Sequence, residues 1–130
     1  MDRGALEKYI GDTYAAEAEF PWVNYPAYAV FRHANNKKWF AVVMEVPRTK
    51  LGAPGDGMLD ILNVKCGPIL IGSFRSEPGI YPAYHMNKSN WLSVALDGSA
   101  EDEKIKLLLD MSYELTALRP KKRKRDGGAG

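Results

Sequence analysis

Residues 81–91 bring together side chains that can both stack on flat groups and form hydrogen bonds. They are Tyr81, Tyr84, His85, Asn87, Lys88 and Trp91. A few polar and aromatic groups that converge on one concavity are typical of a ligand-binding pocket. The cations Lys65 and Lys88 favour a small anionic ligand, and a protein partner is the other candidate. The same residues can also serve only to order a loop, so both interpretations stay open.

The chain offers little for catalysis. Cys66 is the single cysteine, and His85 is the histidine that could activate it. An activated thiol needs a base within hydrogen-bond reach and a third group that orients the base, and no motif places such a group beside His85. The alternative to a nucleophilic role is that Cys66 is a small buried residue at a strand end. We therefore expect no catalytic residues and a protein that is not an enzyme.

Metal and phosphate sites are also not indicated. The two histidines, His33 and His85, are far apart and have no acidic partner at helical spacing, so they do not predict a metal site. Residues 52–57 are rich in glycine but lack the Lys-Ser/Thr ending of a phosphate-binding loop. We expect neither a metal nor a cofactor.

Charge is distributed unevenly along the chain. The net charge of +2 conceals a value of +4 for residues 121–126, −3 for residues 2–19, +3 for residues 20–98 and −3 for residues 99–118. If the two acidic segments are helices in one layer, that layer repels a polyanion and the opposite layer tolerates one.

Nucleic-acid binding is the function that we favour from the sequence, and the ligand- or protein-binding module is the alternative. A binder built on strands needs cations for phosphates and flat groups for grooves or stacking. The candidate phosphate contacts are Arg32, Lys37, Lys38, Lys65 and Lys88. The aromatic residues that interleave with them are Trp39, Tyr81, Tyr84 and Trp91. Lys37 and Lys38 fall at the tip of a predicted hairpin, from which they could reach a DNA groove, and we expect non-specific contacts.

Hydrophobic periodicity and turn residues predict the elements that position these groups. Asn35 and Asn36 suit the hairpin turn because Asn tolerates positive φ. Ser99 can cap the last helix, and Pro120 stops it. The predicted helices are 3–18, 68–76 and 99–118, and the predicted strands are 28–33, 39–46, 58–65 and 91–96, the last of these pairing with Tyr84-His85-Met86.

The two terminal helices each show a stripe of residues expected to be buried. In the first helix the stripe is Leu6, Tyr9, Ile10, Thr13 and Tyr14. In the last helix it is Ile105, Leu108, Leu109, Ser112, Leu115 and Leu118. Burying such stripes on a sheet gives an α+β fold, a two-layer sandwich in which helices cover one face of an antiparallel sheet of about five strands, in the order α-β-β-β-α-β-β-α.

At 130 residues the chain suits a single domain, which we place at 1–119, with 120–130 as a disordered basic and glycine-rich tail. The chain contains no run of about 18 apolar residues, so no membrane span is predicted, and the N-terminus lacks a signal-peptide pattern. A single cysteine fits a reducing compartment, so we expect a cytoplasmic protein, and we expect a monomer.

Two elements together resemble the MmcQ/YjbR family of small bacterial proteins. The first is 62–68, with its Lys65-Cys66 pair at a strand end, and the second is 81–91. The family typically shows a lone Lys-Cys, a short helix, and then Pro-Gly-Tyr-His-Met-Asn-Lys followed closely by Trp. Ala83 stands here where Gly is common. The resemblance extends from Ala5 to Leu118 and implies the same α+β fold and the DNA-binding role proposed for the family.

Overall fold

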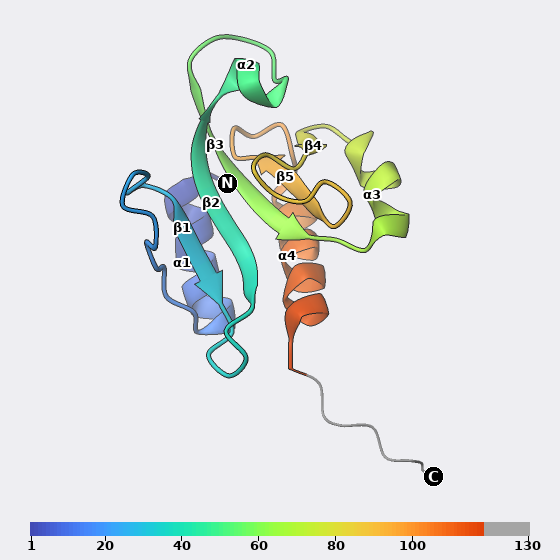
Figure 1. The fold of residues 1–130 in the computed structure, drawn as a ribbon. Helices are drawn as coiled ribbons and strands as arrows, with labels where there is room; N and C mark the ends of the chain where they lie inside the picture. The colour runs from blue at the N-terminus through green and yellow to red at the C-terminus, as the bar shows by residue number, and fades with distance from the viewer. Residues whose placement is uncertain (119–130) are drawn as a thin grey trace.

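A computed structural model describes residues 1–118 of the chain. Its strands form one five-stranded antiparallel sheet in the order β1-β2-β3-β5-β4 (Figure 1). The elements are α1 (Arg3–Tyr14), β1 (Ala29–Arg32), β2 (Trp39–Pro47), α2 (Arg48–Leu51), β3 (Met58–Lys65), α3 (Pro68–Arg75), β4 (Ile80–Pro82), β5 (Trp91–Ala95) and α4 (Asp102–Thr116). The predicted α+β class and the predicted number of strands are confirmed, whereas the four-residue α2 and the position of β4 were not expected. The predicted tail, 120–130, lies outside the described residues.

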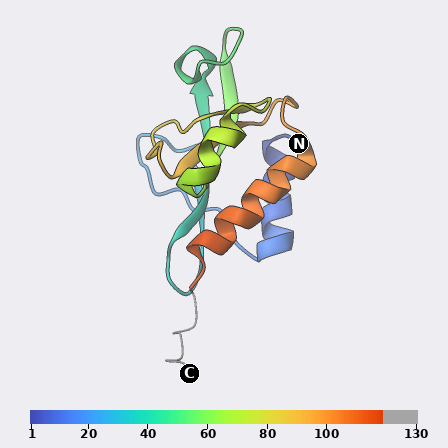
Figure 2. The ribbon, with the colours of Figure 1, turned by 90° about the vertical axis from the view of Figure 1, so that its right-hand side faces the viewer.

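Helices α1 and α4 lie side by side against one face of the sheet, which we call the helix face (Figure 2). Leu6 and Ile10 of α1 and Ile105, Leu108 and Leu109 of α4 are buried there. Ile71 of α3 joins the same core near the β4 edge. The helix layer predicted from the two acidic terminal segments is therefore present. Among residues 1–118, no helix has the length and apolarity needed to cross a membrane.

The opposite face of the sheet, which we call the loop face, is covered by α2 and by two irregular segments, 20–28 and 83–90. Its buried residues are Val30, Val42, Met44, Val46, Leu51, Ala53, Leu59, Ile61 and Ala95. The side chains packed against them are Trp22, Tyr28, Trp39, Tyr81, Tyr84 and Met86. Because both faces are covered, β2 is almost continuously apolar rather than alternating.

Helix α1 ends at Tyr14, so the prediction of a helix up to residue 18 was wrong. Ala15 adopts a left-handed conformation with φ 55°, and its N–H donates to the carbonyl of Gly11 at 3.0 Å. This C-terminal cap turns the chain away from the helix axis. Thr13, expected in the buried stripe, is exposed.

The strand that pairs with β5 is β4, with Ile80 opposite Val94, and not the predicted Tyr84-His85-Met86. The backbone N–H and carbonyl of Tyr84 form hydrogen bonds with the side chains of Ser93 and Asn63 instead of with a neighbouring strand.

The ends of α4 also differ from the prediction. Its N-cap is Glu101, because the Ser99 hydroxyl donates to Asp97 rather than capping the helix. Leu115 and Leu118 are 45% and 62% exposed, whereas Thr116 is 2% exposed. Polar contacts with the β1–β2 hairpin, not an apolar stripe, hold this end of the helix.

Replacing Ala15 with glycine should stabilise the protein by about 0.5–1 kcal/mol. The left-handed conformation costs an L-residue about 1–2 kcal/mol, and the greater chain entropy of glycine in the unfolded state offsets part of the gain. Chemical denaturation of Ala15→Gly measures the change. Ala5→Gly inside α1 is the matched control and should destabilise by up to about 1 kcal/mol. A loss of stability in Ala15→Gly would contradict the assigned cap.

Candidate functional site

The β1–β2 hairpin is fixed to the C-terminal end of α4. His33 Nε2 lies 2.9 Å from Thr116 Oγ1 and 3.1 Å from the carbonyl oxygen of Tyr113. Asn36 Nδ2 donates to the carbonyl of Thr116 at 2.8 Å. The exposed Lys37 and Lys38 therefore extend from a turn with a fixed base, which is the position predicted for them.

His33 is explained by these contacts as a structural residue. The Thr116 hydroxyl donates its proton to the carbonyl of Ser112 at 2.8 Å, so its oxygen accepts from His33. Nε2 must then carry a hydrogen, which is shared between Thr116 and the carbonyl of Tyr113. The turn itself differs from the prediction, because Lys37 takes the positive φ of 65° and not Asn35 or Asn36.

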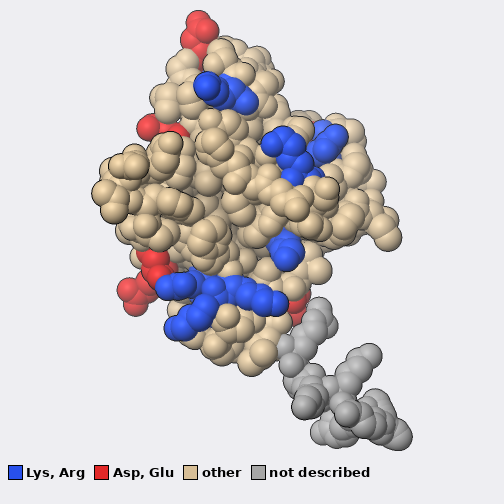
Figure 3. All heavy atoms as spheres, viewed as in Figure 1, with Lys and Arg blue, Asp and Glu red and all other residues tan. Residues whose placement is uncertain are grey.

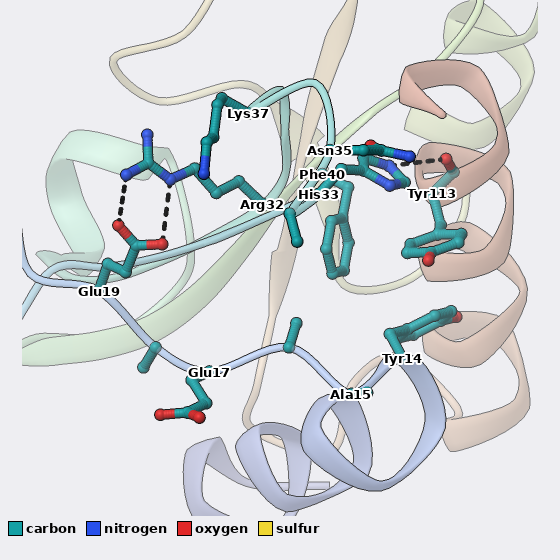
Figure 4. Close-up of a pocket in the computed structure, with 13 residues that line it drawn as sticks. Tyr14, Ala15, Glu17, Glu19, Arg32, His33, Asn35, Lys37, Phe40 and Tyr113 are labelled. Carbon is teal, nitrogen blue, oxygen red and sulfur yellow. Dashed lines mark hydrogen bonds and ion pairs between the residues drawn. The ribbon is translucent and has the colours of Figure 1, made fainter. Parts of the chain in front are cut away.

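A groove of about 640 Å³ lies beside the hairpin (Figure 4). The rings of Tyr14, Phe40 and Tyr113 pack against one another at one end, with Tyr14 and Tyr113 stacked at 4.6 Å. The other end carries Glu19 and Arg32, which face each other in Figure 4. Two of the predicted phosphate contacts, Arg32 and Lys37, line this groove, together with His33.

Arg32 is not available for a phosphate in this arrangement. Its Nε and Nη2 donate to the two carboxylate oxygens of Glu19 at 3.0 and 2.6 Å. The hydrogen bond from Arg32 lowers the pKa of the Glu19 carboxyl, so the pair stays ionised at neutral pH. Two acidic residues, Glu17 and Glu19, and two basic residues, Arg32 and Lys37, line the groove. The groove is therefore neutral overall and does not favour an anion.

The remaining predicted phosphate contacts belong to the loop face. Lys65 ends β3 opposite Trp91, two residues after Asn63, whose side chain points to this face. Lys88 is exposed in the segment before β5. Figure 3 looks onto the loop face and shows Lys and Arg atoms in a band below, over the end of the hairpin, with further groups to the right and at the top. The few acidic atoms visible lie at the margins.

The Tyr81–Trp91 cluster does not converge on one pocket. Tyr81 and Tyr84 pack against the loop-face core, and the carboxamide oxygen of Asn87 accepts from the N–H of Ser89 at 2.8 Å. These contacts of Tyr81, Tyr84 and Asn87 are those expected of residues that order the loop. Of the six predicted ligand contacts, His85 lines a pocket on the loop face.

That cavity is a smaller pocket of about 250 Å³ on the loop face. Its lining residues are Trp22, Tyr25, Tyr28, Trp39, Met44, His85 and Met86. The prediction missed Trp22, Tyr25 and Tyr28, which come from the irregular segment before β1. Their spacing of three residues in a segment with no strand or helix pattern was the available signal.

Two buried polar side chains fix the wall of this pocket. Ser93 Oγ accepts from the N–H of Tyr84 at 2.9 Å and donates to Asn63 Oδ1 at 2.5 Å. Asn63 Nδ2 lies 3.5 Å from the carbonyl oxygen of Tyr84 and 3.5 Å from Met44 Sδ. Asn63 and Ser93 are both completely buried, so the segment that carries His85 and Met86 is held by the sheet itself.

Cys66 and His85 lie on opposite faces of the sheet. Cys66 is 1% exposed in the helix-face core, while His85 is exposed on the loop face. Burial raises the pKa of the Cys66 thiol, which disfavours the thiolate that a nucleophile needs. The geometry does not support the cysteine–histidine pair considered from the sequence.

Comparison with known proteins gives the family. Residues 12–115 match the YjbR family, which is most of the chain. The chain belongs to the YjbR family. It is 38% identical over 116 residues to the uncharacterized protein YyaQ of Bacillus subtilis, covering 89% of this chain and 98% of YyaQ. The uncharacterized protein YjbR of Escherichia coli is 37% identical over 54 residues, covering 41% of this chain and 46% of that protein.

Solved structures of relatives share the fold. A crystal structure of a Pseudomonas syringae protein superposes with a TM-score of 0.88 at 43% identity, covering 90% of this chain and all of that one. A more distant crystal structure from Deinococcus radiodurans gives a TM-score of 0.67 at 22% identity, over 95% of this chain and 83% of that one. The resemblance to the YjbR family stated from the two sequence elements is confirmed.

Ser93→Ala should destabilise the protein by about 1–3 kcal/mol, because it leaves the N–H of Tyr84 and the Asn63 side chain without a partner in a buried setting. Thermal or chemical denaturation measures the loss. Ser89→Ala, at an exposed position in the same loop, should change the stability by less than about 0.5 kcal/mol. Equal effects of the two variants would show that the buried pair does not hold the loop.

The Cys66 thiol should react slowly with an alkylating reagent at neutral pH, because it is buried and its pKa is raised by that burial. The reaction should accelerate only as the pH rises above the ordinary thiol value or as denaturant unfolds the chain. Stopped-flow labelling over a range of pH tests this. Rapid labelling at pH 7 in native conditions would reopen a nucleophilic role for Cys66.

Proposed function

We propose that this protein binds nucleic acid without sequence preference, through the tip of the β1–β2 hairpin and the basic residues of the loop face. It acts in this proposal as a binding protein and not as an enzyme. The observation that carries the proposal is the hairpin, which presents two adjacent exposed lysines from a turn that is fixed to α4.

A fixed base matters for binding because ordering a flexible side chain or loop costs free energy on association. His33 and Asn36 already hold the backbone of the turn, so Lys37 and Lys38 lose less freedom when they meet phosphates. A hairpin tip is also narrow enough to follow a groove, as the β-ribbons of other nucleic-acid-binding proteins do.

The distribution of charge indicates which face of the protein a nucleic acid would approach. Residues 2–19 and 99–118 contain α1 and α4 and each carry −3, so the helix face repels a polyanion. Residues 20–98 carry +3 and supply the sheet and both loop-face segments. The nucleic acid should therefore approach the loop face.

The set of phosphate contacts is smaller than the sequence suggested. Arg32 is occupied by Glu19, which leaves Lys37, Lys38, Lys65 and Lys88. Four phosphate contacts correspond to a salt slope of about −3.6 on duplex DNA, which predicts weak and strongly salt-dependent binding. The basic residues of 121–126 would add phosphate contacts of their own, so they must be removed to measure this surface.

Replacing Lys37 and Lys38 together with glutamine should weaken duplex binding about equally for unrelated sequences and reduce the salt slope by roughly 2, since each phosphate contact contributes about 0.9. The measurement is fluorescence anisotropy against salt concentration, with all variants ending at Leu118.

Lys8→Gln with Lys106→Gln is the matched control. It removes the same charge from α1 and α4 on the helix face and should leave the slope unchanged. If the variant ending at Leu118 shows no duplex binding at low salt, duplex binding by the folded domain is wrong. An equal change of slope in both double variants would show that net charge matters and the hairpin does not.

A further inference from the structure

The pocket on the loop face is bounded by aromatic rings at defined angles. Trp22 stands edge-on to Trp39, with centroids 5.4 Å apart and planes at 76°, and edge-on to Tyr28 at 6.0 Å and 78°. Tyr25 stacks on Tyr28 at 4.7 Å. Met44 of β2 also lines the pocket, and His85 and Met86 contribute from the second loop.

The pocket is formed before any ligand binds. The Asn63 and Ser93 side chains fix the backbone of Tyr84 next to His85, and the His85 ring packs against Tyr84 at 4.0 Å. His85 also holds a left-handed φ of 59°, a conformation that costs an L-residue free energy and that the surrounding structure must maintain. A preformed concavity lined by aromatic groups with a few polar ones is typical of a small-molecule or ring-binding site.

The size of the pocket restricts the ligand. A cavity of about 150 Å³ holds benzene, and pockets for drug-sized ligands run to about 300–1,000 Å³. At about 250 Å³, this pocket suits a single heterocyclic ring system.

The charges near the pocket distinguish two classes of ligand that aromatic rings bind, a quaternary ammonium group and an uncharged ring attached to a phosphate. A cage for a quaternary ammonium group relies on cation–π attraction, and basic neighbours weaken it. Here no acidic residue lines the pocket, and two exposed lysines, Lys38 and Lys88, lie within two residues of the lining residues Trp39 and Met86 in the chain. These lysines favour an uncharged ring attached to a phosphate, which describes a nucleotide.

We propose that the pocket formed by Trp22, Tyr25, Tyr28, Trp39, His85 and Met86 receives one unpaired base of a single-stranded nucleic acid, while Lys38 and Lys88 contact the flanking phosphates. The inference rests on the proposed nucleic-acid binding and specifies its substrate. A base inside a duplex is stacked on both sides and cannot enter, so the pocket selects single strands or frayed ends. Stacking of a base on aromatic side chains accepts any sequence, in keeping with binding that has no sequence preference.

The test compares three ligands with the full chain at one low salt concentration: an oligothymidine of about eight nucleotides, an abasic strand of the same length, and a duplex. The abasic strand carries the same phosphates and no bases. The oligothymidine should bind at least about fivefold more tightly than the abasic strand, which corresponds to the lower end of the range for one stacked base.

Tyr25→Ala should abolish that difference without unfolding the protein, since Tyr25 is 51% exposed. Phe20→Ala is the matched control, because Phe20 is 56% exposed in the same segment and does not line the pocket. It should retain the preference for the oligothymidine. Thymidine added alone should also quench the tryptophan fluorescence, and tetramethylammonium should not.

Equal affinity for the oligothymidine and the abasic strand would overturn the base-binding pocket, and salt-dependent duplex binding that needs Lys37 and Lys38 would still leave the proposed function standing. Quenching by tetramethylammonium at lower concentration than by thymidine would assign the pocket to a cation instead. If the full chain binds none of the three nucleic acids, both the pocket and the proposed function are wrong.

Discussion

The loop face depends on one buried polar contact, in which Ser93 and Asn63 bind the two backbone groups of Tyr84. Segments without helix or strand must satisfy their backbone hydrogen bonds elsewhere, and a buried donor left alone costs about 1–3 kcal/mol. Here the sheet supplies the partners from its own side chains. The segment 83–90 can therefore lie flat on the sheet, cover apolar residues and still hold His85 and Met86 at the wall of a pocket.

The two faces of the sheet differ in what they carry: the helix face holds the larger core, and the loop face holds the candidate binding residues. The helix face buries the large apolar side chains of α1 and α4, and the acidic residues of these helices point away from it. The loop face buries a smaller core and carries the aromatic pocket and the exposed lysines. The β1–β2 hairpin extends beyond the end of the sheet, and its base is bonded to α4. Membership of the YjbR family fixes the fold and leaves the partner to be tested.

The sequence predicted the parts that depend on repeated apolar spacing and missed those that depend on single polar contacts. Ile105, Leu108 and Leu109 follow the helical period and are buried as expected. Leu115 fits the same period but is exposed, because Thr116 reaches His33 instead, a residue 83 positions away. The Arg32–Glu19 pair could not be foreseen either, since it arises where the chain after α1 forms an isolated bridge with β1. The aromatic pocket combines segments around residues 22–28, 39–44 and 85–86, and only the fold brings them together.

The most direct test of the central claim is a nuclear magnetic resonance titration of the isotopically labelled protein with a short single-stranded oligonucleotide. We expect the indole N–H signals of Trp22 and Trp39 to shift, together with the amides of 20–28, 37–39 and 84–88, while the signals of α1 and α4 stay in place. Shifts centred on the groove of Tyr14, Arg32 and Tyr113, or on the helices, with no change at Trp22 and Trp39, would contradict that claim.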